Sequence, residues 1–145
     1  MTFSSQKIVV PVDFSGESEN AIRTAVDIAG DCQRIHLLHV LLPLDSISPG
    51  VLLGDVSDEK REAKINEHLN EIAGRCGAGK AHVKALFGDP GMEIADYAQK
   101  IGADLIVIPS HGYHGVKRLV LGSVAERVIR HANCSVLVVR RSDAE

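Results

Sequence analysis

The 145-residue chain is poor in aromatic residues and has no excess of positive charge. It contains no tryptophan, and aromatic residues make up only 3% of it. Single-stranded nucleic acids are bound largely by stacking on aromatic side chains, so no such platform is expected. The 16 lysines and arginines are outnumbered by 19 aspartates and glutamates, which gives a net charge of −3. This balance argues against binding to nucleic acid or to an anionic membrane.

Long apolar runs are also absent. No run approaches the ~20 residues that a membrane-spanning helix needs. The first residues, MTFSSQK, do not form a basic leader followed by an apolar segment. We therefore expect a cytoplasmic protein. Its length, with 45% hydrophobic and 24% charged residues, predicts one globular domain over residues 1–145.

The cysteines and histidines show no metal-binding or disulfide pattern. Cys32, Cys76 and Cys134 are odd in number and contain no C-x-x-C pair, which favours reduced thiols that pack as small hydrophobes. His111 and His114 lack a third ligand at a recognisable spacing, so no metal site is expected there. His36 and His39 lie in an apolar segment and are interpreted as structural histidines.

Short apolar segments alternate with amphipathic ones along the chain. Strands are predicted over residues 7–12, 34–42, 80–87, 104–108 and 134–139, and helices over 17–29, 57–75, 90–101 and 123–132. Gly30 and Gly102 are expected to end helices, and Asp89-Pro90 to begin one. Residues 43–55 show no sustained period and are expected to form a loop. The alternation predicts an open, five-stranded parallel α/β sheet with helices on both faces, a Rossmann-like arrangement.

Two loops rich in small residues follow predicted strands, at 12–18 (VDFSGES) and at 109–123 (PSHGYHGVKRLVLGS). Open parallel sheets bind ligands beyond the carboxyl ends of their strands, where the strand order reverses. If the first and fourth strands are neighbours, both loops meet at one crevice. The sequence therefore predicts a ligand site between these loops.

The standard nucleotide motifs are missing, because neither G-x-x-x-x-G-K-[ST] nor G-x-G-x-x-G occurs. What remains is Gly112, and Gly122-Ser123 at the start of a predicted helix, where free N–H groups and the helix dipole attract an anion. The alternative is that Ser123 and Glu126 form a capping box, which satisfies the amides of the helix itself. The spacing alone does not decide between a phosphate site and a simple cap.

Four segments of the chain resemble the universal stress protein family, in its single-domain form. They are IVVPVDFSGESENA (8–21), LLHVL (37–41), FGDPGMEIADYAQKIGADLIVI (87–108) and SHGYHGVKRLVLGSVAERVIRHANCSVLVVR (110–140). The expected strand order is 3-2-1-4-5, and the resemblance implies the five-stranded fold and a homodimer. It also implies ATP binding through the pattern G-x-x-G-x9-G-[ST].

The resemblance assigns site residues by position. Pro11, Val12 and Asp13 would flank adenosine, with Asp13 on the ribose hydroxyls, and the backbone of Val40 would hold the adenine edge. Ser123 and Val124 would face the phosphates. The whole expected nucleotide site comprises Pro11, Val12, Asp13, Val40, Pro109, His111, Gly112, Gly115, Gly122, Ser123 and Val124.

Pro109 stands where the family pattern has its first glycine. It lacks an N–H and fixes φ near −65°. One lost hydrogen bond to a charged group would cost about 1.5–3 kcal/mol, or about one to two decades of affinity. We therefore expect a nucleotide site that is altered at one corner and still occupied.

The last predicted strand would form an edge of the sheet, and an exposed apolar edge tends to pair with another chain. Val136, Leu137, Val138 and Val139 are therefore predicted to form a homodimer interface, as the resemblance also implies.

The leading functional hypothesis is an ATP-binding stress or regulatory protein that acts through nucleotide-dependent conformation or partner binding. Mg²⁺ would accompany ATP, and AMP or ADP remain alternative ligands. No general base, nucleophile or arginine finger is apparent, so at most slow ATP hydrolysis is expected. The rival hypotheses are a dimeric interaction module that has lost nucleotide binding and, from the architecture alone, an enzyme acting on adenylates.

Overall fold

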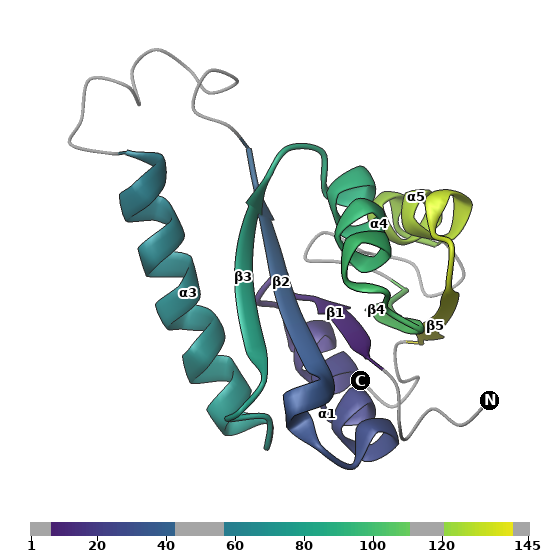
Figure 1. Cartoon of the computed structure of the whole chain (residues 1–145), viewed down its shortest axis with the longest axis horizontal. Helices are drawn as coiled ribbons and strands as arrows, with labels where there is room; N and C mark the ends of the chain where they lie inside the picture. Colours follow the sequence, from purple (N-terminus) through teal and green to yellow (C-terminus); the bar gives the residue numbers. More distant parts are fainter. Residues whose placement is uncertain (1–6, 43–56, 111–120, 141–145) are drawn as a thin grey trace.

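The computed structural model describes residues 7–42, 57–110 and 121–140, and it confirms the predicted alternation of strands and helices (Figure 1). In chain order the elements are β1 (Ile8–Pro11), α1 (Gly16–Ala29), the 3-10 helix η2 (Cys32–Arg34), β2 (Ile35–Leu41), α3 (Asp58–Arg75), β3 (His82–Phe87), α4 (Pro90–Ile101), β4 (Leu105–Pro109), α5 (Ser123–His131) and β5 (Ser135–Val139). The turn η2 was not predicted, because three residues are too few to show a period.

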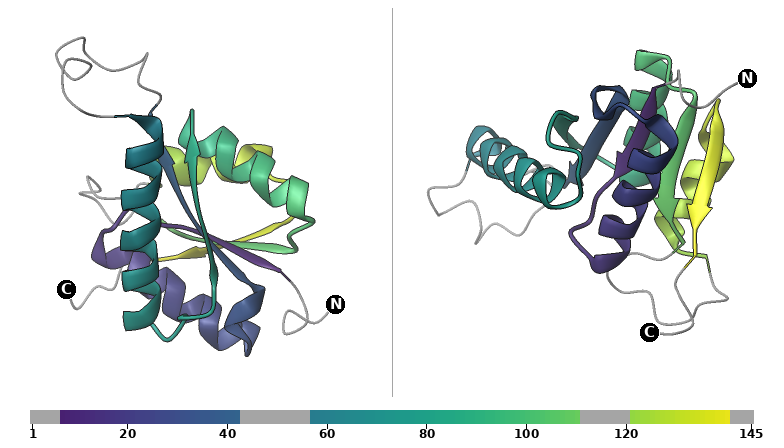
Figure 2. Two further views of the ribbon diagram at one scale, coloured as in Figure 1. Left: turned by 60° about the vertical axis from the view of Figure 1, so that its left-hand side comes forward. Right: turned by 90° about the horizontal axis from the view of Figure 1, so that it is seen from below.

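The five strands form one parallel sheet in the order β3-β2-β1-β4-β5, as predicted. Helices α1 and α3 cover one face of the sheet, and α4 and α5 cover the other (Figure 2). The chain passes from β3, at one edge, through α4 to β4 beyond β1. The strand order therefore reverses between β1 and β4, where a ligand crevice is expected in such sheets.

The core is divided by the sheet into two clusters. Ile8 and Val10 of β1 pack among residues of α1 and α3, whereas Val9 packs among residues of α4 and α5. Neighbouring residues of a strand point to opposite faces, so a strand covered on both sides must be apolar throughout. The central strands β1 and β4 have this composition, and all of Leu105–Pro109 is buried.

Side chains begin three of the helices and glycines end two of them; the sequence predicted the roles of Asp89, Gly30 and Gly102. Ser15, Ser57 and Asp89 each accept a hydrogen bond from the backbone N–H three residues later, which satisfies a free amide at the start of α1, α3 and α4. Gly30 and Gly102 end α1 and α4 in the left-handed conformation that glycine adopts without strain. These local signals set the loop geometry at both ends of the sheet.

Candidate functional site

The candidate site lies at the carboxyl ends of β1 and β4, where the two strands stop pairing. Their register contains two pairs, Ile8 with Leu105 and Val9 with Ile106. Each strand then continues to a proline, Pro11 in β1 and Pro109 in β4. The predicted end of the fourth strand, Ile108, was thus one residue short.

The two prolines explain why the strands separate. Beyond Pro11, Val12 donates its N–H to Leu38 of β2 over 2.7 Å, and beyond Pro109, Ser110 donates to Val139 of β5 over 2.9 Å. Successive N–H groups along a strand point to opposite sides, so the nitrogens of both prolines face the gap between β1 and β4. Proline has no N–H to donate, and the ladder cannot continue across this gap.

Asp13 follows β1 and is held by two serines. Its Oδ1 atom accepts hydrogen bonds from the N–H and hydroxyl of Ser15, at 3.0 and 2.6 Å, and from the hydroxyl of Ser18 at 2.6 Å. The backbone N–H of Asp13 in turn donates to the Ser18 oxygen. Ser18 is fully buried. The carboxylate orientation is therefore set before any ligand arrives, and the two serines are positioning residues that the sequence analysis did not single out.

Phe14 has an unusual backbone conformation next to Asp13. Its φ is +66°, the only positive value among the non-glycine residues that the structure describes. This conformation is strained for a bulky side chain. It closes the turn in which Ser15 returns its N–H to Asp13, and the Phe14 ring packs 4.8 Å from the ring of His39 and 6.0 Å from that of His68. No sequence signal pointed to this strain.

The end of β2 contacts the segment that follows β1. His39 contacts the carbonyl oxygen of Val12 through Nδ1 at 2.6 Å, which confirms its interpretation as a structural histidine. Val40 is half-buried and pairs with Leu86 of β3. Val12 and Val40 are both expected to flank adenosine. The contact of His39 with Val12 links the segment after β1 to the end of β2, where Val40 lies.

Helix α5 begins without a side-chain cap. Its N-cap is Gly122, which has no side chain to accept a hydrogen bond from the first turn, and Ser123 is the first helical residue. The carboxylate of Glu126 pairs with Arg130 at 2.7 Å and is not directed to the cap. The capping box considered from the sequence is therefore wrong, and so is the expectation that Ser123 caps the helix. The helix begins one residue earlier than a cap at Ser123 would require, because Gly122 is the N-cap, and the Ser123 hydroxyl is therefore not in the capping position.

The start of α5 is tied to the end of β4. Gly122 donates its N–H to the carbonyl of Ser110 over 2.6 Å, and Ser110 is only 6% exposed. The first turn of α5, with Ser123 and Val124, is thereby fixed at the carboxyl edge of the sheet. Val124 is 37% exposed there. His111, Gly112 and Gly115, the remaining predicted site residues, lie outside the described residues.

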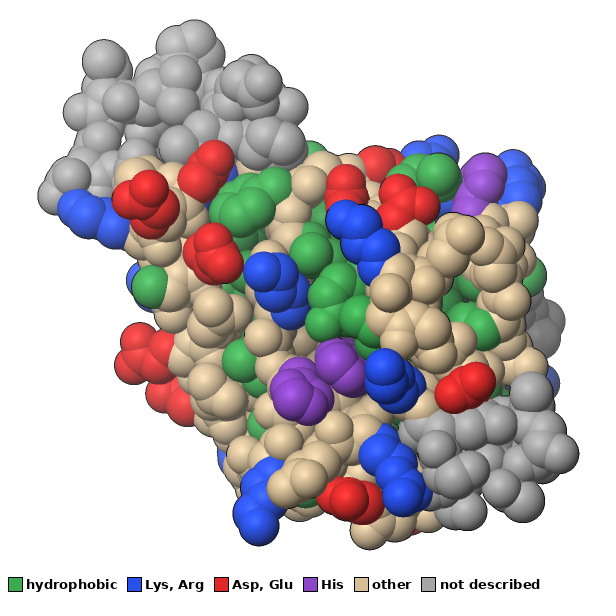
Figure 3. Space-filling view, viewed as in Figure 1, with side chains coloured by type: hydrophobic (Ala, Val, Ile, Leu, Met, Phe, Trp, Pro, Cys, Tyr) green, Lys and Arg blue, Asp and Glu red, His purple; other side chains and the backbone are tan. Residues whose placement is uncertain are grey.

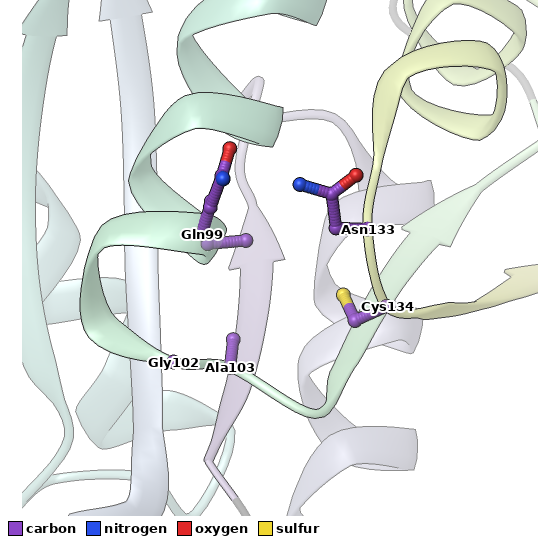
Figure 4. Close-up of a pocket in the computed structure, with 6 residues that line it drawn as sticks. Gln99, Gly102, Ala103, Asn133 and Cys134 are labelled. Carbon is purple, nitrogen blue, oxygen red and sulfur yellow. The ribbon is translucent and has the colours of Figure 1, made fainter.

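A shallow opening of about 200 Å³ lies at the amino ends of β4 and β5, at the end of the sheet away from the candidate site. It is lined by Ala98, Gln99, Gly102, Ala103, Asn133 and Cys134 (Figure 4). Burial, and to a smaller extent the Asp104 carboxylate, raise the pKa of the Cys134 thiol. A protonated thiol is a weak nucleophile. The opening therefore offers amides and a thiol, but no reactive group.

Neither a metal cluster nor a membrane helix is found in the described part of the chain. Residues 7–42, 57–110 and 121–140 contain no group of three histidine, cysteine or acidic side chains that could hold a metal ion. Over the same residues, no helix combines the length and hydrophobicity needed to cross a bilayer. All three cysteines are free thiols.

Comparison with known proteins identifies the family. The profile of the universal stress protein family matches residues 4–140. A universal stress protein of Methanocaldococcus jannaschii is 35% identical over 150 residues, which cover 97% of this chain and 85% of that protein. The solved structure of universal stress protein UspA from Lactobacillus plantarum has a TM-score of 0.74 and 28% identity, covering 93% of this chain and 97% of that one.

A second solved structure was determined with a nucleotide. It is the universal stress protein of Archaeoglobus fulgidus in complex with dAMP, with a TM-score of 0.60 and 25% identity, covering 97% of this chain and 100% of that one. The strand order and the family profile agree. The chain belongs to the universal stress protein family.

Proposed function

We propose that the protein is a cytoplasmic adenine-nucleotide-binding regulatory protein of the stress response, with ATP, carried with Mg²⁺, as its main ligand. It would act as a single domain through nucleotide-dependent conformation or partner binding, and turnover of the nucleotide would be slow or absent. The related Archaeoglobus fulgidus protein with dAMP supports an adenine nucleotide as the ligand class.

The observation that carries the proposal is the start of α5, which has no side-chain cap and is anchored to the end of β4, the strand next to the one that leads to Asp13. The N-cap of α5 is a glycine, which supplies no side-chain acceptor, whereas the N-cap side chains of α1, α3 and α4 each accept a hydrogen bond from a backbone N–H. Free N–H groups at a helix start bind phosphate favourably. Asp13 follows the neighbouring strand, with its carboxylate already oriented for a polar ligand.

Gly122 has a conformation that does not require glycine. Its φ of −65° and ψ of 153° are accessible to any residue, and serine, asparagine or aspartate would cap the helix better. A glycine at this position is explained by close approach of a phosphate to the backbone. In the proposed complex, the N–H groups of Ser123 and Val124 bind phosphate, Asp13 binds the ribose hydroxyls, and Val40 faces the adenine.

The binding test is calorimetric titration of the purified protein with ATP, ADP and AMP, with and without Mg²⁺. We expect saturable binding of at least one of them, and a loss of tenfold or more in Gly122→Val, whose Cβ branch would occupy the phosphate position. Gly74→Ala, in α3, serves as the control and should bind like the wild type. Absence of binding at millimolar nucleotide would favour the interaction module that has lost its ligand.

We also propose that β5 pairs with β5 of a second copy. It is an edge strand, and Leu137 on it is 37% exposed, an arrangement that favours pairing with another chain. Light scattering at micromolar concentration should give a dimer for the wild type and a monomer for Leu137→Lys. Leu42→Lys, at an exposed leucine beyond β2, is the control. A monomeric wild type would contradict the proposed interface.

A further inference from the structure

Two histidines form a pair at the amino ends of β2 and β3, whereas the proposed nucleotide site lies at the carboxyl ends of the strands. His36 and His82 are register partners on these parallel strands, so their side chains leave the same face of the sheet. Their ring centroids are 4.6 Å apart, and the ring planes differ by 20°. Figure 3 shows two histidine side chains side by side near the middle of one face of the molecule.

Tyr97 of α4 holds the His36 ring. Its hydroxyl lies 3.0 Å from Nδ1 of His36, and among the described residues this is the only hydrogen bond of that ring. The exposed His82 ring has none in the same part of the chain. In the tautomer in which Nδ1 donates to Tyr97, the Nε2 lone pair of His36 is available. Metal-binding histidines are oriented in this way, by a partner on their second nitrogen.

The groups around the His36 ring disfavour its charged form. Burial, then the neighbouring His82 and Lys7, lower the pKa of His36 to about 4. Metal binding requires an unprotonated imidazole. The groups that bear on the His36 ring are the imidazole of His82, the Tyr97 hydroxyl and Lys7.

We propose that His36 and His82 form a binding site for a late first-row divalent cation, with water completing its coordination. Zinc–nitrogen bonds of about 2.0–2.1 Å place two ligand nitrogens on one ion roughly 3 Å apart. The ring planes of the ligand-free pair are only 20° apart, so both lone pairs reach one ion only after a ring rotates about its terminal torsion, which is soft in histidine.

The ligand chemistry selects the ion. Two imidazoles without a carboxylate suit Cu²⁺, Ni²⁺ and Zn²⁺ and do not suit Ca²⁺ or Mg²⁺, which prefer oxygen ligands. Lys7 opposes the cation, which makes the site weaker than a structural zinc site and its occupancy reversible. The site is distinct from the crevice that would hold the nucleotide, and it does not depend on that proposal.

The test is titration of the untagged protein with Zn²⁺, followed by calorimetry, and with Cu²⁺, followed by electron paramagnetic resonance. We expect one Zn²⁺ site per chain, saturated below about 100 μM metal, and a Cu²⁺ spectrum with two coordinated nitrogens. His82→Gln, at an exposed position, should weaken Zn²⁺ binding at least tenfold. His131→Gln, an exposed histidine at the end of α5, is the matched control and should leave it unchanged.

Two further variants keep the result interpretable. His36→Gln should remove the same site, and Tyr97→Phe should weaken it about tenfold, because the ring loses its orienting partner. Circular dichroism verifies that each variant is folded. The proposal is overturned if the wild type binds no Zn²⁺ at 100 μM, if His82→Gln binds with wild-type affinity, or if the Cu²⁺ spectrum shows a single nitrogen.

Discussion

The Nδ1 atom of His39 lies 2.6 Å from the carbonyl oxygen of Val12. This contact joins the end of β2 to the segment that follows β1. The His39 ring also packs against Phe14, whose positive φ sharpens the turn after Asp13. One side chain therefore supports both the segment that follows β1 and the strained turn beside it.

Replacing His39 tests how much this contact contributes. His39→Phe keeps an aromatic ring against Phe14 but leaves the Val12 carbonyl without its side-chain donor. We expect the free energy of unfolding to fall by about 1–3 kcal/mol in urea denaturation. His68→Phe changes an exposed ring near the same phenylalanine and should shift stability by less than about 0.5 kcal/mol. Equal effects of the two variants would assign the stability to ring packing alone.

Ser18 is a second test of the turn. Its hydroxyl donates to Asp13 and accepts from the Asp13 backbone, and the residue is fully buried. Ser18→Ala should lower the free energy of unfolding by about 1–3 kcal/mol, because both groups of Asp13 lose a partner. Thr24→Ala, which removes an exposed hydroxyl on α1, provides the comparison. If thermal denaturation showed no difference between these two variants, the preorganisation of Asp13 would be wrong.

Adding a methyl group should have opposite effects on stability at two helix glycines, Gly91 in α4 and Gly74 in α3. A Cβ on Gly91 would lie 2.6 Å from the Cβ and Cγ atoms of Arg127, which pairs with Asp89 at 2.7 Å. Gly91→Ala should therefore cost about 1–3 kcal/mol of stability. At Gly74 in α3 a Cβ meets nothing within 4 Å, so Gly74→Ala should stabilise by about 0.4–1 kcal/mol. Chemical denaturation measures both, and the same sign for the two would contradict the packing.

Acid should destabilise the protein through His36. Its pKa in the folded state is about 4, against 6.5 for an unperturbed histidine. Between these values the unfolded chain binds a proton that the folded chain does not, so stability is lost as the pH falls from about 6.5 to about 4. The ring is partly exposed, and solvent screening limits the loss to about 1–2 kcal/mol. Urea denaturation across this range, with chelator present, should give a shallower pH dependence for His36→Gln than for the wild type.

Periodicity and end signals in the sequence were sufficient to predict the order of the elements. The apolar spacing from Ala21 to Ala29 and the αL glycines Gly30 and Gly102 act within a few residues, so they are legible without the fold. The expected strand order is confirmed by the structure. The small-residue loops after β1 and β4 predicted the region of the site independently of the family resemblance.

Other features depend on contacts between distant residues and appear only in the folded chain. The neighbours of His36 are His82, 46 positions away, and Tyr97, 61 positions away, and no local pattern encodes either distance. The cap of α5 differed from its sequence signature by one residue, because Gly122 is anchored to Ser110 at the end of β4. Local propensity selects helices and strands, whereas the packing of the sheet decides which polar atoms meet.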